Sequence, residues 1–230
     1  TGIVLKTAGP QTISVTETEN AAVVGSKVLT VTAASVVSAT LSGISQPVVA
    51  GSSLNPTITV RDAFGNTATT YTGVVSFSST DPTATLPPAY TFTAGDQGAK
   101  TFAGSLVFRR AGIHQLTYTI ASSPIGAPGG KGVAASIAPN IEIIQVHPAA
   151  VAILELTWPS TSVAAGQRLT PTLKVRDAYG NIVTSYRGTV RFRSSDPQAV
   201  LPSNYTFTAS NNGSVTLGNS VILKTAGART

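Results

Sequence analysis

The feature of the sequence that most constrains the fold is an internal repeat. The phrase VRDAFGNTATTYTG begins at Val60, and VRDAYGNIVTSYRG begins at Val175, which is 115 positions later (175 − 60). The match runs without a gap from Val48 to Gly112, whose counterpart is Gly227. Self-similarity at a fixed interval is typical of tandem arrays, so we expect two copies of one folding unit.

Short alternating segments make up each copy. TITVRD places Ile58 and Val60 on one face and Thr59 and Arg61 on the other, and TLKVRD repeats this pattern. VVSFSS and TVRFRS likewise predict inward side chains at Val75, Phe77, Val190 and Phe192. About seven such segments in roughly 100 residues, separated by turn phrases, predict an all-β fold of tandem immunoglobulin-like β-sandwich domains.

The phrase D-A-[FY]-G-N predicts a tight turn. The Asp62 carboxylate can accept backbone N–H bonds two residues on, and Gly65 can supply a positive φ. With their flanks, VRDAFGNTATTYTGVVSFSSTDP and VRDAYGNIVTSYRGTVRFRSSDP resemble bacterial Ig-like repeats of the invasin/intimin type. They are also similar to tandem repeats of large secreted surface proteins and adhesins. The resemblance implies the same sandwich fold and a secreted, extracellular or cell-surface setting.

The two ends of the chain carry related phrases. LKTAG at residues 5–9 corresponds to FRRAG at 108–112, an offset of 103 (112 − 9), whereas LTV at 29–31 corresponds to IQV at 144–146 at the full 115. The difference, 12 residues (115 − 103), is an insertion within the Gly/Pro-rich segment 121–140. We therefore expect residues 1–34 to be the last two strands of a repeat, 35–148 a complete domain, and 149–230 a domain without its last two strands.

The unpartnered strands predict an interface between subunits or repeats. Their expected inward side chains are Ile13, Val15, Leu29 and Val31. At about 1.5–3 kcal/mol for each buried side chain, they represent about 6–12 kcal/mol, against a domain stability of about 5–15 kcal/mol. The incomplete domain should need these strands from copies of the chain, assembled head-to-tail, or from neighbouring repeats of a longer chain. Either arrangement favours a structural repeat unit of an extracellular filament or of an adhesin stalk.

Basic residues in the second copy raise an alternative function. The net charge is +6, and Lys174, Arg176, Arg191 and Arg193 form a candidate polyanion-binding face. A non-catalytic glycan-binding or polyanion-binding module is one explanation, and a sheet kept soluble by its charges is the other. Trp158 could stack on a sugar or pack within the domain. No aromatic platform alternates with the charges, so we expect no nucleic acid partner.

The sequence offers no catalytic constellation. It has no cysteine and two histidines, His114 and His147, at places that do not correspond between the copies. No motif for a nucleophile, a metal or a bound cofactor is present, so we expect a protein that is not an enzyme and needs no cofactor. Calcium at an acidic turn stays open, although Asp62 and its counterpart Asp177 suit turn capping better. No apolar run approaches the ~20 residues that a membrane-spanning helix needs.

Overall fold

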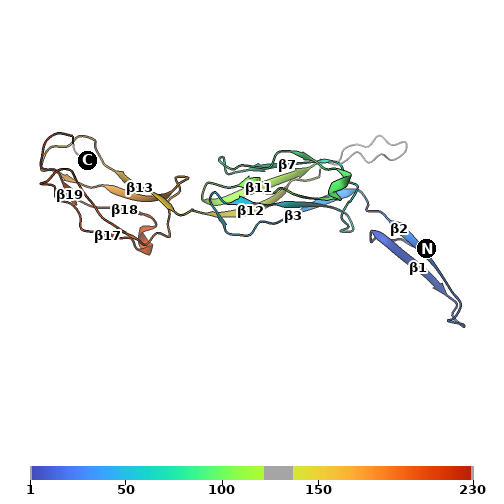
Figure 1. The fold of residues 1–230 in the computed structure, drawn as a ribbon. Coiled ribbons are helices and arrows are strands. Elements are labelled where there is room, and N and C mark those ends of the chain that lie inside the picture. Colours follow the sequence, from blue (N-terminus) through green and yellow to red (C-terminus); the bar gives the residue numbers. More distant parts are fainter. Residues whose placement is uncertain (1, 122–136, 229–230) are drawn as a thin grey trace. The chain divides into compact units, whose positions relative to one another are not determined.

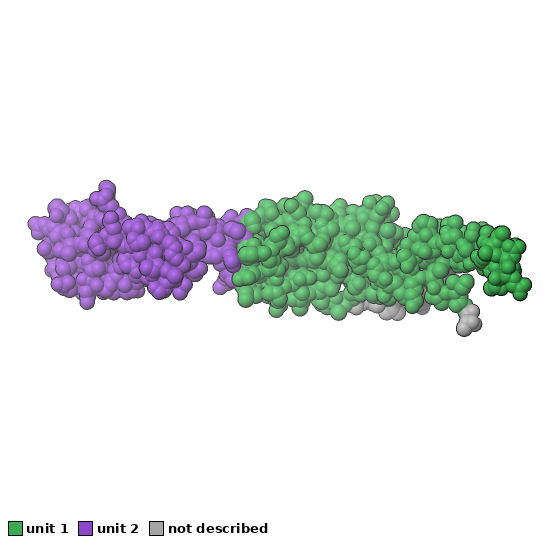
Figure 2. Space-filling model, turned by 90° about the horizontal axis from the view of Figure 1, so that it is seen from below, with its two compact units in different colours: residues 1–48, 52–108, 113–145 green, residues 49–51, 109–112, 146–230 purple. Residues whose placement is uncertain are grey.

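The computed structural model describes residues 2–121 and 137–228, which consist almost entirely of strands and connecting loops (Figure 1). The chain separates into two compact units (Figure 2). Unit 1 contains residues 1–48, 52–108 and 113–145, and unit 2 contains residues 49–51, 109–112 and 146–230. The all-β prediction is confirmed. The domain limits at 34 and 148 stay predictions, and residues 122–136 of the segment 121–140, which contains the predicted insertion, lie outside the described residues.

The amino-terminal segment of unit 1 forms a two-stranded antiparallel hairpin, blue in Figure 1. β1 (Gly9–Thr16) pairs with β2 (Val24–Val31) in a continuous register. In this register Gln11 lies opposite Leu29, Ile13 opposite Lys27, and Val15 opposite Gly25. Residues directly opposite each other point to the same face of an antiparallel pair. The odd-numbered residues of both strands therefore share one face of the hairpin.

The larger part of unit 1 is a two-layer β-sandwich. One layer has the order β3 (Val36–Ser42), β6 (Thr57–Asp62) and β9 (Ala99–Thr101). The other layer has the order β4 (Val48–Val49), β12 (Asn140–His147), β11 (Gly112–Ile120), β7 (Val74–Ser79) and β8 (Tyr90–Thr91). A short pair, β5 (Ser53–Leu54) with β10 (Leu106–Val107), and a 3₁₀ turn, η1 (Ala94–Asp96), complete the described elements. This division of strands between two facing sheets is immunoglobulin-like.

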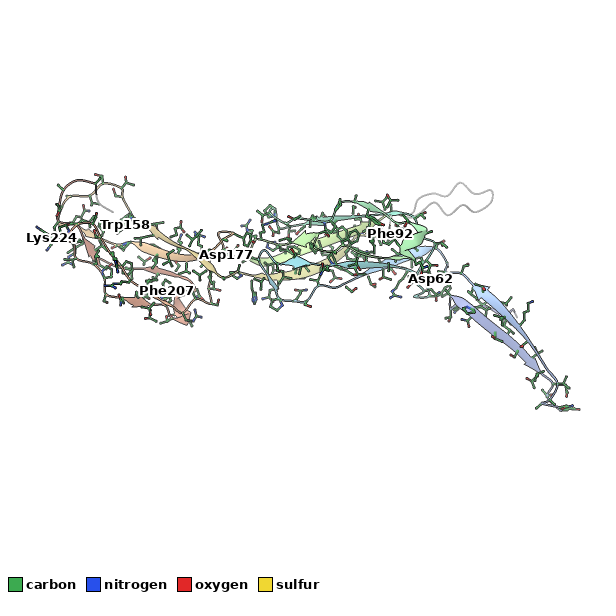
Figure 3. The ribbon with its side chains drawn as sticks, viewed as in Figure 1. Asp62, Phe92, Trp158, Asp177, Phe207 and Lys224 are labelled. Atoms are coloured by element: carbon green, nitrogen blue, oxygen red, sulfur yellow. The ribbon has the colours of Figure 1, made fainter. Side chains whose placement is uncertain are left out.

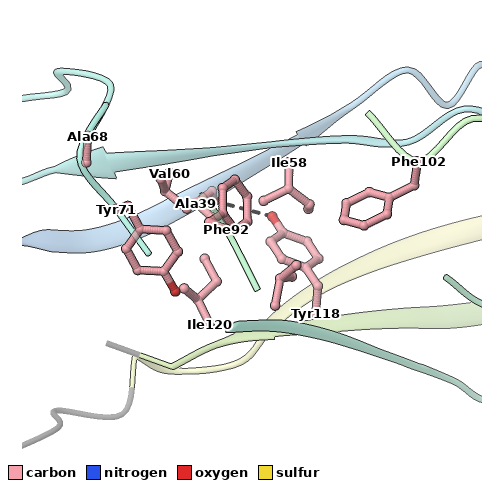
Figure 4. Close-up of a cluster of buried hydrophobic side chains, with 10 residues drawn as sticks. Ala39, Ile58, Val60, Ala68, Tyr71, Phe92, Phe102, Tyr118 and Ile120 are labelled. Carbon is pink, nitrogen blue, oxygen red and sulfur yellow. Dashed lines mark hydrogen bonds between the residues drawn. The ribbon is translucent and has the colours of Figure 1, made fainter. Parts of the chain in front are cut away.

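The core of unit 1 lies between the two layers (Figure 4). Ile58 and Val60 of β6 are fully buried, as their alternation with Thr59 and Arg61 predicted. Tyr118 of β11 reaches across the core, and its hydroxyl donates a hydrogen bond to the carbonyl oxygen of Ala39 at 3.3 Å. The hydroxyl thereby finds a partner without leaving the apolar interior, which links the two sheets.

Unit 2 repeats one of these layers in full and the other in part. The full layer has the order β13 (Val151–Thr157), β15 (Thr172–Asp177) and β18 (Ser214–Thr216). The remaining pairs are β16 (Thr189–Val190) with β17 (Tyr205–Thr206) and β14 (Arg168–Leu169) with β19 (Val221–Ile222), and η2 (Ala209–Asn211) is a 3₁₀ turn. One cluster of its core consists of Leu173, Val175, Val183, Val190 and Phe207.

Among the described residues, the partial layer of unit 2 contains no counterparts of β11 and β12. In unit 1, β7 lies between β8 and β11 and spans six residues. Its counterpart β16 pairs only with β17 among the described residues and spans two residues. Similarly, Val48 belongs to β4 beside β12, whereas its counterpart Val163 belongs to no strand. A strand needs a hydrogen-bonded neighbour, so residues that follow β16 stay irregular.

Candidate assembly site

The hairpin presents an apolar face. Ile13, Val15, Leu29 and Val31, the four residues predicted to form an interface, all have odd numbers and share this face in the observed register. Val15 is 68% exposed and Leu29 is 41% exposed, while Ile13 and Val31 are half-buried. A two-stranded hairpin has only one layer and leaves such side chains in water. The four side chains therefore lie on one partly exposed face, which also carries Gln11 and Lys27.

The counterparts of these four residues are buried in unit 1. The offsets of the repeat match Ile13 and Val15 to Leu116 and Tyr118 of β11, and Leu29 and Val31 to Ile144 and Val146 of β12. Each of these counterparts is at most 2% exposed. The hairpin thus carries apolar side chains at the positions where a complete sandwich buries them.

Unit 2 contains an open groove next to its partial layer. The groove has a volume of about 430 Å³, and its apolar lining includes Leu156, Trp158, Val163, Leu169, Val221 and Leu223. In unit 1 the counterparts of Val163, Val221 and Leu223 are Val48, Leu106 and Phe108, which are all buried. His114 of β11 stacks on Phe108, with ring centroids 6.3 Å apart. The groove of unit 2 therefore lies where β11 and β12 cover the core of unit 1.

The groove lies towards one end of unit 2. Trp158, which lines it, is near that end together with Lys224, whereas Asp177 is towards the other end and Phe207 is inside (Figure 3). Trp158 is 42% exposed, so its ring contributes an open apolar surface to the groove wall. The two interpretations of Trp158 from the sequence, sugar stacking and packing, both stay open at this position.

The pairing of β11 with β7 predicts how the hairpin would meet β16. In unit 1, Tyr118 lies opposite Phe77 and Thr119 lies opposite Ser76. The hydroxyl oxygens of Ser76 and Thr119 are 2.6 Å apart. By the repeat offsets, Thr16 of β1 corresponds to Thr119, and Arg191, which follows β16, corresponds to Ser76. The predicted register therefore places Thr16 opposite Arg191, with Val15 pointing into the groove.

The four basic residues of the candidate polyanion-binding face lie on different sheets. Lys174 and Arg176 are on β15, in the complete layer, whereas Arg191 and Arg193 follow β16, in the partial layer. The Nε of Arg176 donates to Oε2 of Glu155 at 2.5 Å, and this hydrogen bond lowers the pKa of Glu155. The four residues thus form two separate pairs on different sheets, and Arg193 of the second pair lines the groove.

A buried carboxylate holds the carboxyl-terminal copy of the LKTAG phrase. Asp196 accepts hydrogen bonds from the Lys224 N–H at 2.7 Å, the Thr225 N–H at 3.0 Å and the Thr225 hydroxyl at 2.6 Å. The bond from the Thr225 hydroxyl has the largest effect and holds the pKa of Asp196 well below its ordinary range. Residues 224–225 are therefore fastened to unit 2 beside the groove.

The described residues contain no cluster of three side chains suited to holding a metal ion. His114 is buried against Phe108, and His147, which ends β12, accepts a hydrogen bond from the Ala50 N–H through its backbone oxygen. Asp62 and Asp177 both cap their own turns through hydrogen bonds to backbone N–H groups. None of the helices in residues 2–121 and 137–228 has the length and apolar character to cross a membrane.

The sequence predicts that Asn66 and Asn181 either tolerate a left-handed conformation or bond the backbone, and it does not identify their distant partners. Each ends a D-A-[FY]-G-N turn and forms hydrogen bonds to a backbone segment about 60–70 positions earlier in the chain. A signal was present, because an Ala-Gly pair precedes each turn, at residues 8–9 and 111–112. When two phrases that are distant in the sequence both recur in each copy of a repeat, they are therefore candidates for contact with each other.

Comparisons with known proteins find a similar fold but no family. No family model matches the sequence, and no match was found among the curated proteins. Nine solved chains are similar in structure. FdeC, an Escherichia coli adhesin, is 20% identical with a TM-score of 0.44, and β-glucuronidase 3 of Bacteroides uniformis is 13% identical with a TM-score of 0.27. The similarities cover 87% and 81% of this chain but only 60% and 21% of the other chains. Similarity at this level supports no inference about function.

Proposed function

We propose that this chain is a structural repeat unit of an extracellular filament or of a surface adhesin stalk, assembled head-to-tail by strand complementation. The β1–β2 hairpin of one copy enters the groove of unit 2 in another copy and completes its second layer. The observation that carries this proposal is the match between the hairpin face and the buried side chains of β11 and β12. Strand addition to an open sheet edge is a general mode of protein assembly.

This arrangement would bury apolar surface on both partners and pair backbone groups of the groove. The hairpin removes Val15 and Leu29 from water, and the groove covers Val163, Leu223 and the ring of Trp158. Backbone N–H and C=O groups beyond β16 gain hydrogen-bond partners, which the corresponding residues of β7 have in β11. A contact between two different surfaces of the same chain gives an open filament unless the rotation between copies closes a ring. In the proposed assembly, repeated addition of copies extends a filament.

The extracellular setting rests on the resemblance of the repeated phrases to bacterial Ig-like repeats of surface proteins. That resemblance involves both copies of the turn and its flanks, VRDAFGN and VRDAYGN. A mechanical role agrees with a chain that offers apolar contact surfaces and turn-capping carboxylates. The partner is then a second copy of this chain, and the proposed location is the cell surface or the secreted fraction.

Disulfide trapping tests the proposal, because the chain has no cysteine of its own. Two full-length variants, Thr16→Cys and Arg191→Cys, are mixed and oxidised. The predicted register places these residues opposite each other in different copies, so a covalent heterodimer should form. The matched control replaces Arg191→Cys with Lys174→Cys, which lies on β15 in the other layer. If both mixtures give the same yield of heterodimer, separate copies do not exchange strands and the head-to-tail proposal is overturned.

A second candidate function is binding of a glycan or another polyanion. The observation in its favour is that Arg191 and Arg193 are both exposed, and neither forms an ion pair within the described part of the chain. Their counterparts in unit 1 are Ser76 and Ser78. The variant Arg191→Ser/Arg193→Ser therefore gives unit 2 the residues that unit 1 has at these two positions. Loss of retention on immobilised heparin would support this function, and equal retention of the variant and the unmodified chain would exclude it.

A further inference from the structure

The turn of unit 1 binds the backbone segment that leads into the hairpin. Asn66, the last residue of the D-A-F-G-N turn, donates from Nδ2 to the carbonyl oxygen of Lys6 at 2.7 Å. Its Oδ1 accepts a hydrogen bond from the Ala8 N–H at 2.9 Å. One amide side chain thus pairs with one carbonyl and one N–H of a segment that bends at Thr7, and β1 begins at the next residue, Gly9.

The same turn also binds the segment that leaves the hairpin. Asp62 Oδ2 accepts a hydrogen bond from the N–H of Ala34, which follows β2, at 2.9 Å. The other oxygen, Oδ1, accepts from the N–H groups of Phe64 and Asn66, both at 2.9 Å. Asn66 Nδ2 donates to Oδ2 of Asp62 at 2.8 Å, which links the two side chains. Both ends of the hairpin are therefore attached to one turn, which we name the clamp (residues 62–66).

Unit 2 contains the same set of contacts around β11 and β12. Asn181 donates to the carbonyl oxygen of Arg109 at 2.7 Å and accepts from the Ala111 N–H at 2.8 Å. Asp177 accepts from the Ala149 N–H at 2.9 Å. Ala111 directly precedes β11, and Ala149 follows β12 by two residues. Within unit 2, the second turn thus binds the residues that flank β11 and β12, the two strands that the hairpin matches.

We infer that the clamp is a backbone-binding site that positions the hairpin for insertion into another copy. This inference rests on the proposed assembly. The residues that flank the hairpin form the same three kinds of hydrogen bond as the residues that flank β11 and β12. The ends of the hairpin therefore need no rearrangement when it docks. Fixing both ends before binding reduces the conformational entropy lost on docking. Asn66 and Asp62 are therefore positioning residues for assembly, although neither lies on the apolar face.

The clamp recognises main-chain atoms. Lys6 and Ala8 contribute a carbonyl oxygen and an N–H, and the Lys6 side chain extends over the Phe64 ring, with Nζ 5.7 Å from the centroid. The corresponding groups in unit 2 come from Arg109 and Ala111, so the residue at the first position changes while the bonds stay the same. Recognition of this kind depends on the spacing of one C=O and one N–H two residues apart.

The first test uses the monomer at low concentration and is independent of assembly. In Asn66→Ala, the {¹H}–¹⁵N nuclear Overhauser effects of the β1 and β2 amides should fall relative to those of β6. The exposed Asn204, which forms no side-chain hydrogen bond that the described residues show, provides the control Asn204→Ala. Ala8→Pro is a second variant that removes the donated N–H and keeps the Asn66–Asp62 bond. Unchanged hairpin amides in both Asn66→Ala and Ala8→Pro would overturn the inference.

The second test measures assembly in the full-length chain. Asn66→Ala is added to Thr16→Cys and mixed with Arg191→Cys. Trapping should slow by about tenfold, as expected for the loss of two neutral hydrogen bonds that order the donor, while Asn204→Ala trapping should proceed at the original rate. Equal rates with and without Asn66 would refute the positioning role and leave strand exchange standing. Absence of trapping in every mixture would refute the exchange itself, and the monomer measurement would still decide whether the clamp orders the hairpin.

Discussion

Replacing two apolar residues of the hairpin by serine should weaken assembly by a predictable amount. Val15 is 68% exposed and Leu29 is 41% exposed, whereas their counterparts Tyr118 and Ile144 are 2% and 1% exposed. Docking should therefore remove nearly all of the remaining exposed surface of both side chains. Full burial of such a side chain contributes about 1.5–3 kcal/mol, so the exposed fractions correspond to about 1.6–3.2 kcal/mol for the pair. The variant Val15→Ser/Leu29→Ser should raise the dissociation constant roughly 15- to 200-fold.

Sedimentation velocity over a dilution series measures this change. The control is Val24→Ser/Val28→Ser, on the opposite face of the hairpin, where both residues are more than half exposed. The counterpart of Val28 is Ile143, which is 52% exposed in the completed sandwich, so this face should stay in water after docking. An equal shift in both double variants would mean that the hairpin does not dock through the predicted face. No shift in either would refute the burial argument.

Three further predictions concern the turns and their buried carboxylates. Burial tends to raise the pKa of Asp62, but hydrogen bonds from the Asn66 side chain and from three backbone N–H groups outweigh it and hold the pKa at about 2. The folded-state pKa lies below the ordinary 3.8, so the stability that Asp62 provides is present above about pH 4 and is lost as pH falls towards 2. Melting temperatures should decline in this range, and less so in Asp62→Asn. Gly180 has φ +84 and open space around an added Cβ, so Gly180→Ala should reduce the free energy of unfolding of unit 2 by about 1 kcal/mol in urea titrations, and Gly180→Asn should reduce it less. Asp196→Ala should accelerate amide exchange at Lys224 and Thr225, which lose their acceptor; unchanged protection would show that other contacts hold this segment.

Much of the fold follows from the repeat and from alternation. Ile58 and Val60, and their counterparts Leu173 and Val175, are buried as the two-residue period requires. The common face of the four hairpin residues follows from parity within each strand and from the observed register, which pairs odd-numbered residues with odd-numbered ones. Local pattern and fold agree in these segments because every second residue of a half-buried strand is apolar and faces the core.

The position of the basic residues and the extent of β16 depend on which sheet a strand joins. The alternation of apolar and polar residues does not show this. Arg176 and Arg191 both face outward in the sequence pattern, yet they belong to different layers, so the four basic residues form no single face. The extent of β16 was also hidden, because its residues have strand character but lack a hydrogen-bonded neighbour beyond Val190. The contacts of Asn66 with Lys6 and Ala8 leave no local pattern, and their one signal in the sequence is that the Ala-Gly pair and the turn repeat together.

Lys27 lies opposite Ile13, on the apolar face of the hairpin. An exposed hydrophobic strand pair is a template for aggregation, and two hairpins stacked face to face would form a dry, amyloid-like zipper. Such stacking would bury the Lys27 ammonium group without a counter-charge, at a high desolvation cost. In the completed sandwich the counterpart of Lys27 is Glu142, which is only half-buried, so an ammonium group there would reach water. In the proposed assembly, Lys27 therefore disfavours stacking of one hairpin on another and remains compatible with docking in the groove.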